Sequence, residues 1–175
     1  MKLFCTVFFS LLLFSSCLEV NKRSYLSEID TLLLDIDSMK TQAETLSIDT
    51  VDSLRKLRCD LLSAYKNDNP SDTITIETAQ HIENLKFSCS NLKAFLDQKE
   101  TLNQIEMYRN ELLQLQKLIN KGEGERSSYN ELIAEEKQNI QVLKSNFEQI
   151  QRYYQNGIRN FGVSEEYLKS LMNLE

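Results

Sequence analysis

Glycine and proline are scarce in this chain, and their scarcity limits the folds open to it more than any other feature. The 175 residues contain four Gly and one Pro. A sheet protein needs a turn about every ten residues, and turns draw heavily on these two residue types. The chain is also rich in Leu, Glu, Lys and Gln, which are good helix formers. We therefore predict an all-α protein.

Apolar residues recur at alternating steps of three and four, which places them on one face of a helix. The first predicted helix covers residues 24–67 and carries this pattern in two phases, at Leu26, Ile29, Leu33 and Ile36 and then at Val51, Leu54, Leu61 and Tyr65. Between the two phases lie Ser47, Asp49 and Thr50, all good N-cap residues, so the helix is expected to bend or restart there.

The second predicted helix lies between two clear stop signals. Pro70 ends the first helix because it donates no amide hydrogen, and Ser71 or Asp72 can cap the second helix. The helix then runs to the segment 121–128, where Gly122 and Gly124 can take left-handed backbone angles. Its apolar stripe shifts phase on the way, from Ile82, Leu85, Cys89, Leu92 and Leu96 to Leu102, Ile105, Leu112 and Ile119. We interpret this shift as a stutter that unwinds a supercoil locally without breaking the helix.

The third predicted helix carries the cleanest heptad pattern and ends near Gly157. Its stripe has one polar interruption, at Glu136, and consists of Tyr129, Ile133, Glu136, Ile140, Leu143, Phe147, Ile150 and Tyr154. A short helix from Ser164 closes the chain. Because short connections make neighbouring helices antiparallel, we predict an elongated antiparallel three-helix bundle or coiled coil over residues 24–175. In general shape this resembles spectrin-type coiled-coil hairpins.

The first residues of the chain have the pattern of a secretory signal peptide. Lys2 gives a positive start, an apolar block runs from Leu3 to Phe14, and small residues follow. Twelve residues of helix span roughly 18 Å, which is short of the ~30 Å hydrocarbon core of a bilayer. The block ends in Leu13-Phe14-Ser15-Ser16-Cys17, which resembles the lipobox of bacterial lipoproteins, although Phe14 is bulkier than the usual residue at its place.

The resemblance to bacterial lipoproteins implies a signal peptide over residues 1–16 and acylation of Cys17, followed by a polar tether over residues 17–23. The acyl chains would hold the protein on a bilayer in the bacterial cell envelope. Leu18 rather than Asp after the cysteine favours the outer membrane under the sorting rule of enteric bacteria. An ordinary cleaved signal or an uncleaved anchor is the alternative.

Two cysteines, Cys59 and Cys89, remain after cleavage and acylation. In an oxidising compartment an even pair predicts a disulfide. Two separate buried thiols on the apolar stripes are the alternative.

No residue pattern indicates catalysis, a cofactor or a metal site. His81 is the single histidine and is expected to pair with Glu77 on the surface, which is too few ligands for zinc. The acidic pairs 135–136 and 165–166 are interpreted as solvated helix faces. An aromatic group is expected to anchor the terminal helix, and it consists of Tyr129, Tyr153, Tyr154, Phe161 and Tyr167.

The formal net charge of −6 argues against nucleic-acid binding, which requires a basic face. We expect a membrane-anchored envelope lipoprotein that is not an enzyme and that acts as a helical scaffold or adaptor for another envelope protein. A small-molecule or lipid-binding module, with a cavity in the middle of the bundle, is the alternative. A homodimer is also predicted, because four leucines broaden the apolar stripe of the first helix: Leu32, Leu34, Leu57 and Leu62.

Overall fold

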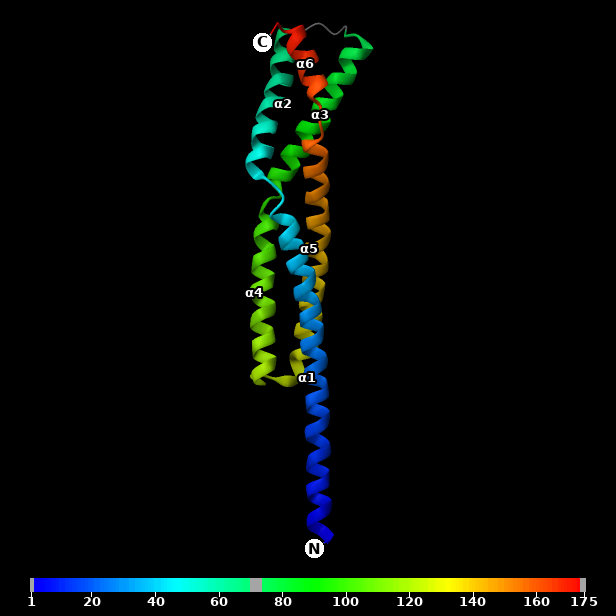
Figure 1. Cartoon of the computed structure of the whole chain (residues 1–175), viewed down its shortest axis with the longest axis vertical. Helices are drawn as coiled ribbons and strands as arrows, with labels where there is room; N and C mark the ends of the chain where they lie inside the picture. Colours follow the sequence, from blue (N-terminus) through cyan, green and yellow to red (C-terminus); the bar gives the residue numbers. More distant parts are fainter. Residues whose placement is uncertain (1, 70–73, 174–175) are drawn as a thin grey trace. The chain divides into compact units, whose positions relative to one another are not determined.

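The computed structural model describes residues 2–69 and 74–173, with side chains described from Asn21 onward. The described residues form helices and turns and include no strand, so the all-α prediction is confirmed. The elements are α1 (Lys2–Ala43), α2 (Ile48–Asp68), α3 (Ile76–Asp97), α4 (Glu100–Lys121), the short 3-10 turn η1 (Arg126–Ser128), α5 (Tyr129–Ile158) and α6 (Gly162–Leu171), shown in Figure 1.

The first predicted helix restarts at Ser47. The Ser47 hydroxyl accepts a hydrogen bond from the amide of Thr50 at 3.2 Å, which caps the free amino end of α2. α2 then ends at Asp68, and the capping residue Asn69 donates its amide to Tyr65. The predicted capping residues Ser71 and Asp72 lie outside the described residues, and α3 is capped instead by Thr75, which accepts from the amide of Thr78 at 3.1 Å.

The prediction that the stutter leaves the second helix intact is wrong. α3 ends at Asp97 and α4 begins at Glu100. At the break, the Gln98 amide bonds to the Phe95 carbonyl at 3.2 Å, a bond over three residues that tightens the last turn. The reason lies in packing: Leu102 follows the break and still packs against the cluster that contains Phe95. The phase shift is therefore absorbed by a turn rather than by a change of supercoil.

The turn before α5 forms as predicted. Gly122 and Gly124 have φ values of 68° and 84°, in the left-handed region that favours glycine. A Cβ on Gly122 would also lie 2.9 Å from a guanidinium nitrogen of Arg126. The tight glycine turn lets α5 follow α4 after a short connection.

The chain divides into two compact units. The first comprises Met1–Thr41 with Asn103–Lys144, and the second comprises Gln42–Leu102 with Ser145–Glu175. Most of α1 and most of α4 belong to unit 1, whereas α2, α3 and α6 belong to unit 2. The first half of α5 belongs to unit 1 and its second half to unit 2.

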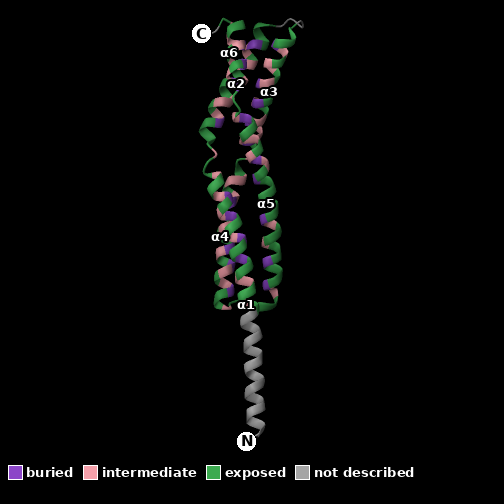
Figure 2. Ribbon diagram, turned by 45° about the vertical axis from the view of Figure 1, so that its right-hand side comes forward, coloured by how far each residue is buried: buried purple, intermediate pink, exposed green. Residues whose placement is uncertain are grey.

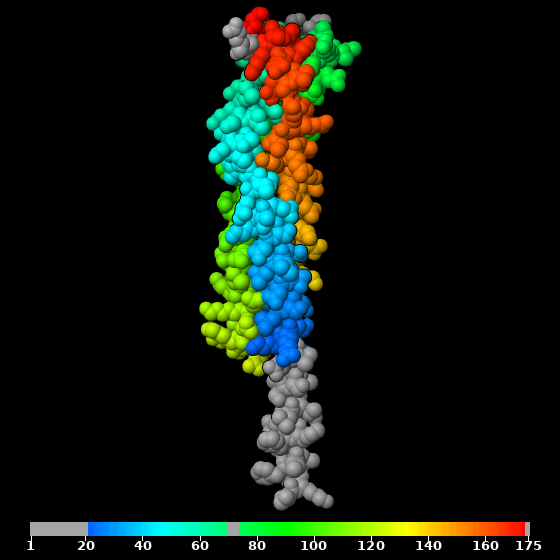
Figure 3. Space-filling view, in the orientation of Figure 1, coloured from blue at the N-terminus to red at the C-terminus, as the bar shows by residue number. Residues whose placement is uncertain are grey.

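In unit 1, α1 and α4 run antiparallel. As residue numbers rise along α1, the numbers of their hydrogen-bond partners on α4 fall. Asp30 accepts from Gln116 at 2.6 Å, Asp37 accepts from Arg109 at 2.7 Å, and Lys40 donates to Glu106 at 2.8 Å. The surfaces of α1 and α4 lie side by side in Figure 3. Buried residues recur along the helices, as the purple positions in Figure 2 show. The core of this unit includes Ile29, Ile36, Ile105, Leu112, Ile119, Ile133 and Ile140.

In unit 2, the surface of α2 lies beside the second half of α5 and α6, as Figure 3 shows. One apolar cluster consists of Val51, Leu92, Phe95 and Ile150, and the other of Leu61, Tyr65, Leu85, Phe161 and Leu168. The second cluster joins α2, α3 and α6, so the short terminal helix is a packed part of this unit.

The stripe that suggested a homodimer is partly covered within the chain. Leu32 is buried and Leu62 is half-buried against the second cluster, whereas Leu34 and Leu57 are exposed. Only two of the four leucines therefore remain as candidates for an intermolecular contact.

Candidate functional site: a buried arginine network

Unit 2 contains a buried arginine, Arg58. Arg58 is 3% exposed and lies on the same face of α2 as the buried residues Val51, Leu61 and Tyr65. These four residues follow one another at steps of seven, three and four, so the helical period itself carries Arg58 inward. A charge in such a position is costly unless it is paired and hydrogen-bonded.

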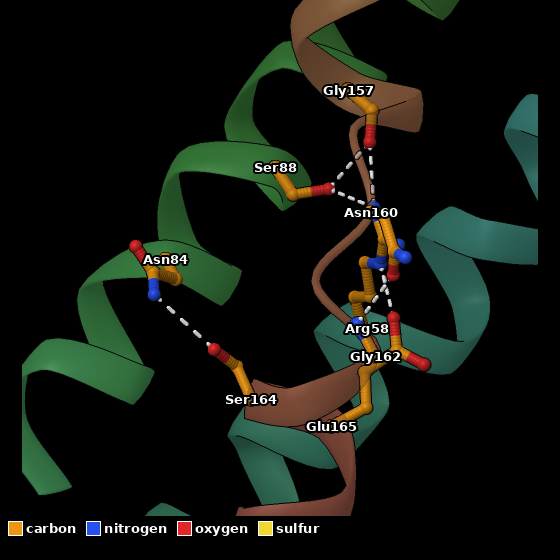
Figure 4. A network of polar contacts seen from close by, with 8 residues as sticks. All are labelled: Arg58, Asn84, Ser88, Gly157, Asn160, Gly162, Ser164 and Glu165. Atoms are coloured by element: carbon orange, nitrogen blue, oxygen red, sulfur yellow. Dashed lines mark hydrogen bonds and ion pairs between the residues drawn. The ribbon is translucent and has the colours of Figure 1, made fainter.

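The Arg58 guanidinium meets partners from three other segments of the chain (Figure 4). Its Nε donates to Oε1 of Glu165 at 2.6 Å, and its Nη1 lies 2.6 Å from both the Ser88 hydroxyl and the Gly157 carbonyl. The Ser88 hydroxyl donates to the same carbonyl at 2.7 Å. The guanidinium carbon also lies 5.5 Å from the centre of the Phe161 ring, within the range of a cation–π contact.

Two partners of Arg58 carry negative charge and lie at helix ends. Gly157 lies in the last turn of α5, where carbonyls lack helical partners and carry partial negative charge, and Glu165 lies in the first turn of α6. One cation thus satisfies the end of one helix and a carboxylate of the next. The network joins α2 and α3 to the chain segment that leads into α6.

Gly157 has a steric role in addition to its carbonyl. A Cβ at this position would lie 2.6 Å from Cδ2 of Leu92 and 3.2 Å from the Leu92 backbone nitrogen. The absence of a side chain therefore allows the end of α5 to approach α3 closely, which brings the Gly157 carbonyl within reach of Ser88 and Arg58.

A second layer of polar contacts fixes α6 on α3. Ser164 is 3% exposed, and its hydroxyl lies 3.0 Å from Nδ1 of His81 and accepts a hydrogen bond from the Asn84 side-chain amide at 3.2 Å. The His81 ring stacks on Tyr167 with centroids 4.1 Å apart, and the Tyr167 hydroxyl lies 3.0 Å from that of Thr78. The predicted surface pairing of His81 with Glu77 is wrong, because packing of α6 supplies a stacking partner and a hydroxyl that the sequence pattern could not place.

Cys59 and Cys89 are brought together next to the network. The structure joins them in a disulfide with Cα atoms 5.6 Å apart, inside the range that a disulfide requires. Each cysteine follows directly after a network residue, Arg58 on α2 and Ser88 on α3. The covalent link and the polar network therefore hold the same pair of helices at the same level.

The acidic pairs behave differently from the prediction of solvated faces. Glu165 pairs with Arg58, and the side chain of Glu165 is only 14% exposed. Glu136, on the α5 half that belongs to unit 1, is half-buried, and its Oε2 is buried without a hydrogen-bond partner among the described residues. Burial, together with the nearby charges of Glu111 and Glu135, raises the pKa of Glu136 above its ordinary value. The partners Glu135 and Glu166 are exposed, as predicted.

The predicted aromatic group is divided among three places. Tyr129 meets Tyr25 edge to face in unit 1, with centroids 6.0 Å apart. Tyr153 and Tyr154 pack against the first cluster of unit 2, and only Phe161 and Tyr167 contact the core around α6. Heptad spacing placed Tyr129 and Tyr154 on one stripe, but a stripe of this length runs through both units and its ends have separate neighbours.

The arrangement around Arg58 is suited to packing rather than to chemistry. Both hydroxyls, of Ser88 and Ser164, are buried and hydrogen-bonded, and the arginine is paired. A group of three or more His, Cys, Asp or Glu residues that could hold a metal ion does not occur in the described part of the chain. We interpret the site as an internal lock of unit 2, by which we mean a set of contacts that fixes α6 against α2 and α3.

The side chain of Cys17, the predicted lipidation site, lies outside the described residues. Across the helices whose side chains are described, none has the length and apolar character needed to cross a bilayer.

Comparisons with known proteins return no relative: no family model, no curated protein and no solved structure matches the chain.

Proposed function

We propose that this chain is a lipid-anchored helical adaptor of the bacterial cell envelope, attached to the bilayer through an acylated Cys17. The lipobox-like ending of the apolar block supports the anchor. The positions of Cys59 and Cys89 support an oxidising compartment, because their Cα atoms lie 5.6 Å apart as a disulfide requires. The helices are proposed to form an antiparallel three-helix arrangement with the short terminal helix packed on it.

The observation that carries the adaptor role is that the charged and hydroxyl groups of the Arg58 network bond to one another and to the backbone inside the protein. Arg58, Ser88 and Ser164 bond within the protein and present nothing to a substrate. A lock of this kind holds α6 in one position relative to α3. A surface that is already fixed reduces the conformational entropy lost when a partner binds.

Exposed apolar side chains on the locked helices supply a contact for a protein partner. Val163 at the start of α6 is 75% exposed, and Ile76 at the start of α3 is 89% exposed. Burial of these side chains against a partner would remove apolar surface from water, which favours association at both positions.

The experiment that tests the adaptor role is site-specific photo-crosslinking in cells. A photoreactive residue at Val163 or Ile76 is expected to give the same discrete adduct with one envelope protein. A photoreactive residue at Glu148, exposed and polar on the same unit, is the matched control and should not give it. Equal labelling from all three positions would count against a defined partner surface.

A further inference from the structure

An open hollow lies on unit 2 between the last turns of α2 and the first turns of α3. Its volume is about 330 Å³. Leu62, Tyr65, Ile74 and Ile82 supply its apolar lining, and Lys66 and Lys86 also line it. It is separate from the Arg58 network.

The apolar lining is held in place but not covered. Leu62 and Ile82 pack against the cluster that contains Leu85 and Leu168, and each remains only half-buried. Ile74 precedes α3 and is 44% exposed. The hollow therefore presents fixed apolar surface that a small apolar group could cover.

The charged groups at the hollow are cations, although the whole chain carries a net charge of −6. Among the described residues Lys66 makes no ion pair, and Lys86 pairs at 2.8 Å with Glu83, where both side chains are more than half exposed. Such exposed pairs are weak and exchange readily. Lysine stems cover apolar surface while their ammonium groups reach outward, so both can meet an anion at the rim.

The Ser63 and Asn69 side chains of the lining bond to the protein backbone. The Ser63 hydroxyl donates to the Cys59 carbonyl at 2.9 Å, and the Asn69 side chain donates to the Tyr65 carbonyl at 3.2 Å. Together with the Tyr65 hydroxyl, the chemistry left for a ligand is an apolar surface next to two ammonium groups.

We propose that this hollow binds a single-chain fatty acid, with its alkyl chain against Leu62, Ile74 and Ile82 and its carboxylate near Lys66 and Lys86. The volume is at the lower end of the range of ligand pockets, roughly 300–1,000 Å³, which suits one short chain better than a two-chain lipid. The site does not depend on the adaptor role, and it lies at α2 and α3 rather than in the middle of the bundle, where the sequence-based alternative placed a cavity.

Methyl NMR of the full chain in zwitterionic nanodiscs tests the proposal. The probes are hexanoate, octanoate and decanoate, and titration of empty nanodiscs in parallel gives the free concentration of each. The methyl groups of Ile74 and Ile82 are expected to shift saturably, whereas those of Ile48 and Ile133, away from the hollow, stay unchanged. Each added methylene should lower Kd about fourfold until the hollow is full, which corresponds to ~0.8 kcal/mol per buried methylene.

The charge requirement is tested with matched ligands and variants. Decanol, which has no carboxylate, should bind more weakly than decanoate. Lys66→Gln with Lys86→Gln should raise the Kd of decanoate about tenfold, since an exposed pair contributes up to about fivefold. Lys93→Gln removes an exposed lysine from α3, the helix that carries Lys86, and should leave the Kd of decanoate unchanged.

Four results would overturn the proposal. The first is equal binding of decanol and decanoate, and the second is equal loss of affinity in the Lys93 variant. The third is a shift of all isoleucine methyls together, which indicates partition into the bilayer. Saturable shifts produced by a peptide with a free terminal carboxylate but not by decanoate would also reject the fatty acid and assign the hollow to a protein ligand.

Discussion

Replacement of Arg58 by methionine tests whether the buried network locks α6. The variant fills a similar volume but leaves Glu165, whose side chain is 14% exposed, and the Gly157 carbonyl without their cation. Removal of one partner from a buried ion pair costs about 3–5 kcal/mol, because the remaining charge loses both water and its partner. At about 1.4 kcal/mol per factor of ten, amides of α6 should open at least a hundredfold more often.

Hydrogen exchange followed by mass spectrometry measures this opening in the full chain, and peptides from α6 report on unit 2 separately from unit 1. Arg152→Met removes an exposed arginine from α5 and is the control, with an expected change below about 0.5 kcal/mol. Addition of Glu165→Leu to Arg58→Met should recover most of the loss, since an apolar pair can replace a buried ion pair at little cost. If α6 exchanges equally in the two single arginine variants, the network does not stabilise this helix.

Three further predictions concern other parts of the two units. Cys59→Ser with Cys89→Ser removes a disulfide between cysteines 30 residues apart and should lower the free energy of unfolding of unit 2 by about 3–4 kcal/mol in the chain-entropy model. Urea denaturation measures this change, and an unchanged midpoint would contradict the prediction. Burial raises the pKa of Glu136, so the folded state holds more protons than the unfolded state, and the free energy of unfolding should fall as pH rises from 4.5 through the folded pKa. Glu136→Gln should remove that fall and stabilise unit 1 at pH 7 by about 1 kcal/mol. Thermal unfolding at several pH values measures both effects. Gly157→Ala should destabilise unit 2 by about 1–3 kcal/mol, because the added methyl overlaps Leu92, and a neutral effect in urea denaturation would mean that α3 and α5 can separate freely.

Most helix limits could be predicted because local chemistry decides them. Ser47 caps a helix, and Gly122 and Gly124 take left-handed angles, whatever the rest of the chain does. The break after Asp97 could not be predicted in the same way. A phase shift in an apolar stripe is compatible with either an unwound helix or a turn, and the choice depends on which cluster Leu102 reaches.

The arginine network shows what a heptad pattern hides. Arg58 occupies the position between Leu54 and Leu61 that the stripe of α2 leaves to a polar residue, and this gap was the available signal. It did not reveal a buried charge, because a stripe interrupted by arginine is equally compatible with an exposed position. The decision depends on Glu165 and Gly157, which are about a hundred residues further along the chain.

Gly157 illustrates the same limit. Its position near the end of an apolar stripe predicts a helix end, and α5 does end at Ile158. Its second role, close approach to Leu92, requires knowledge of which helix lies opposite. Likewise, two cysteines predict a disulfide from their number and compartment, whereas their position beside Arg58 and Ser88 depends on the pairing of α2 with α3.

The most direct test of the proposed lipid-anchored adaptor is the intact mass of the native protein extracted from membranes. We predict the mass of residues 17–175 increased by a diacylglycerol and an amide-linked acyl chain and reduced by two hydrogens for the disulfide. A mass that corresponds to the unprocessed chain, with Met1 present and no lipid, would contradict the proposal.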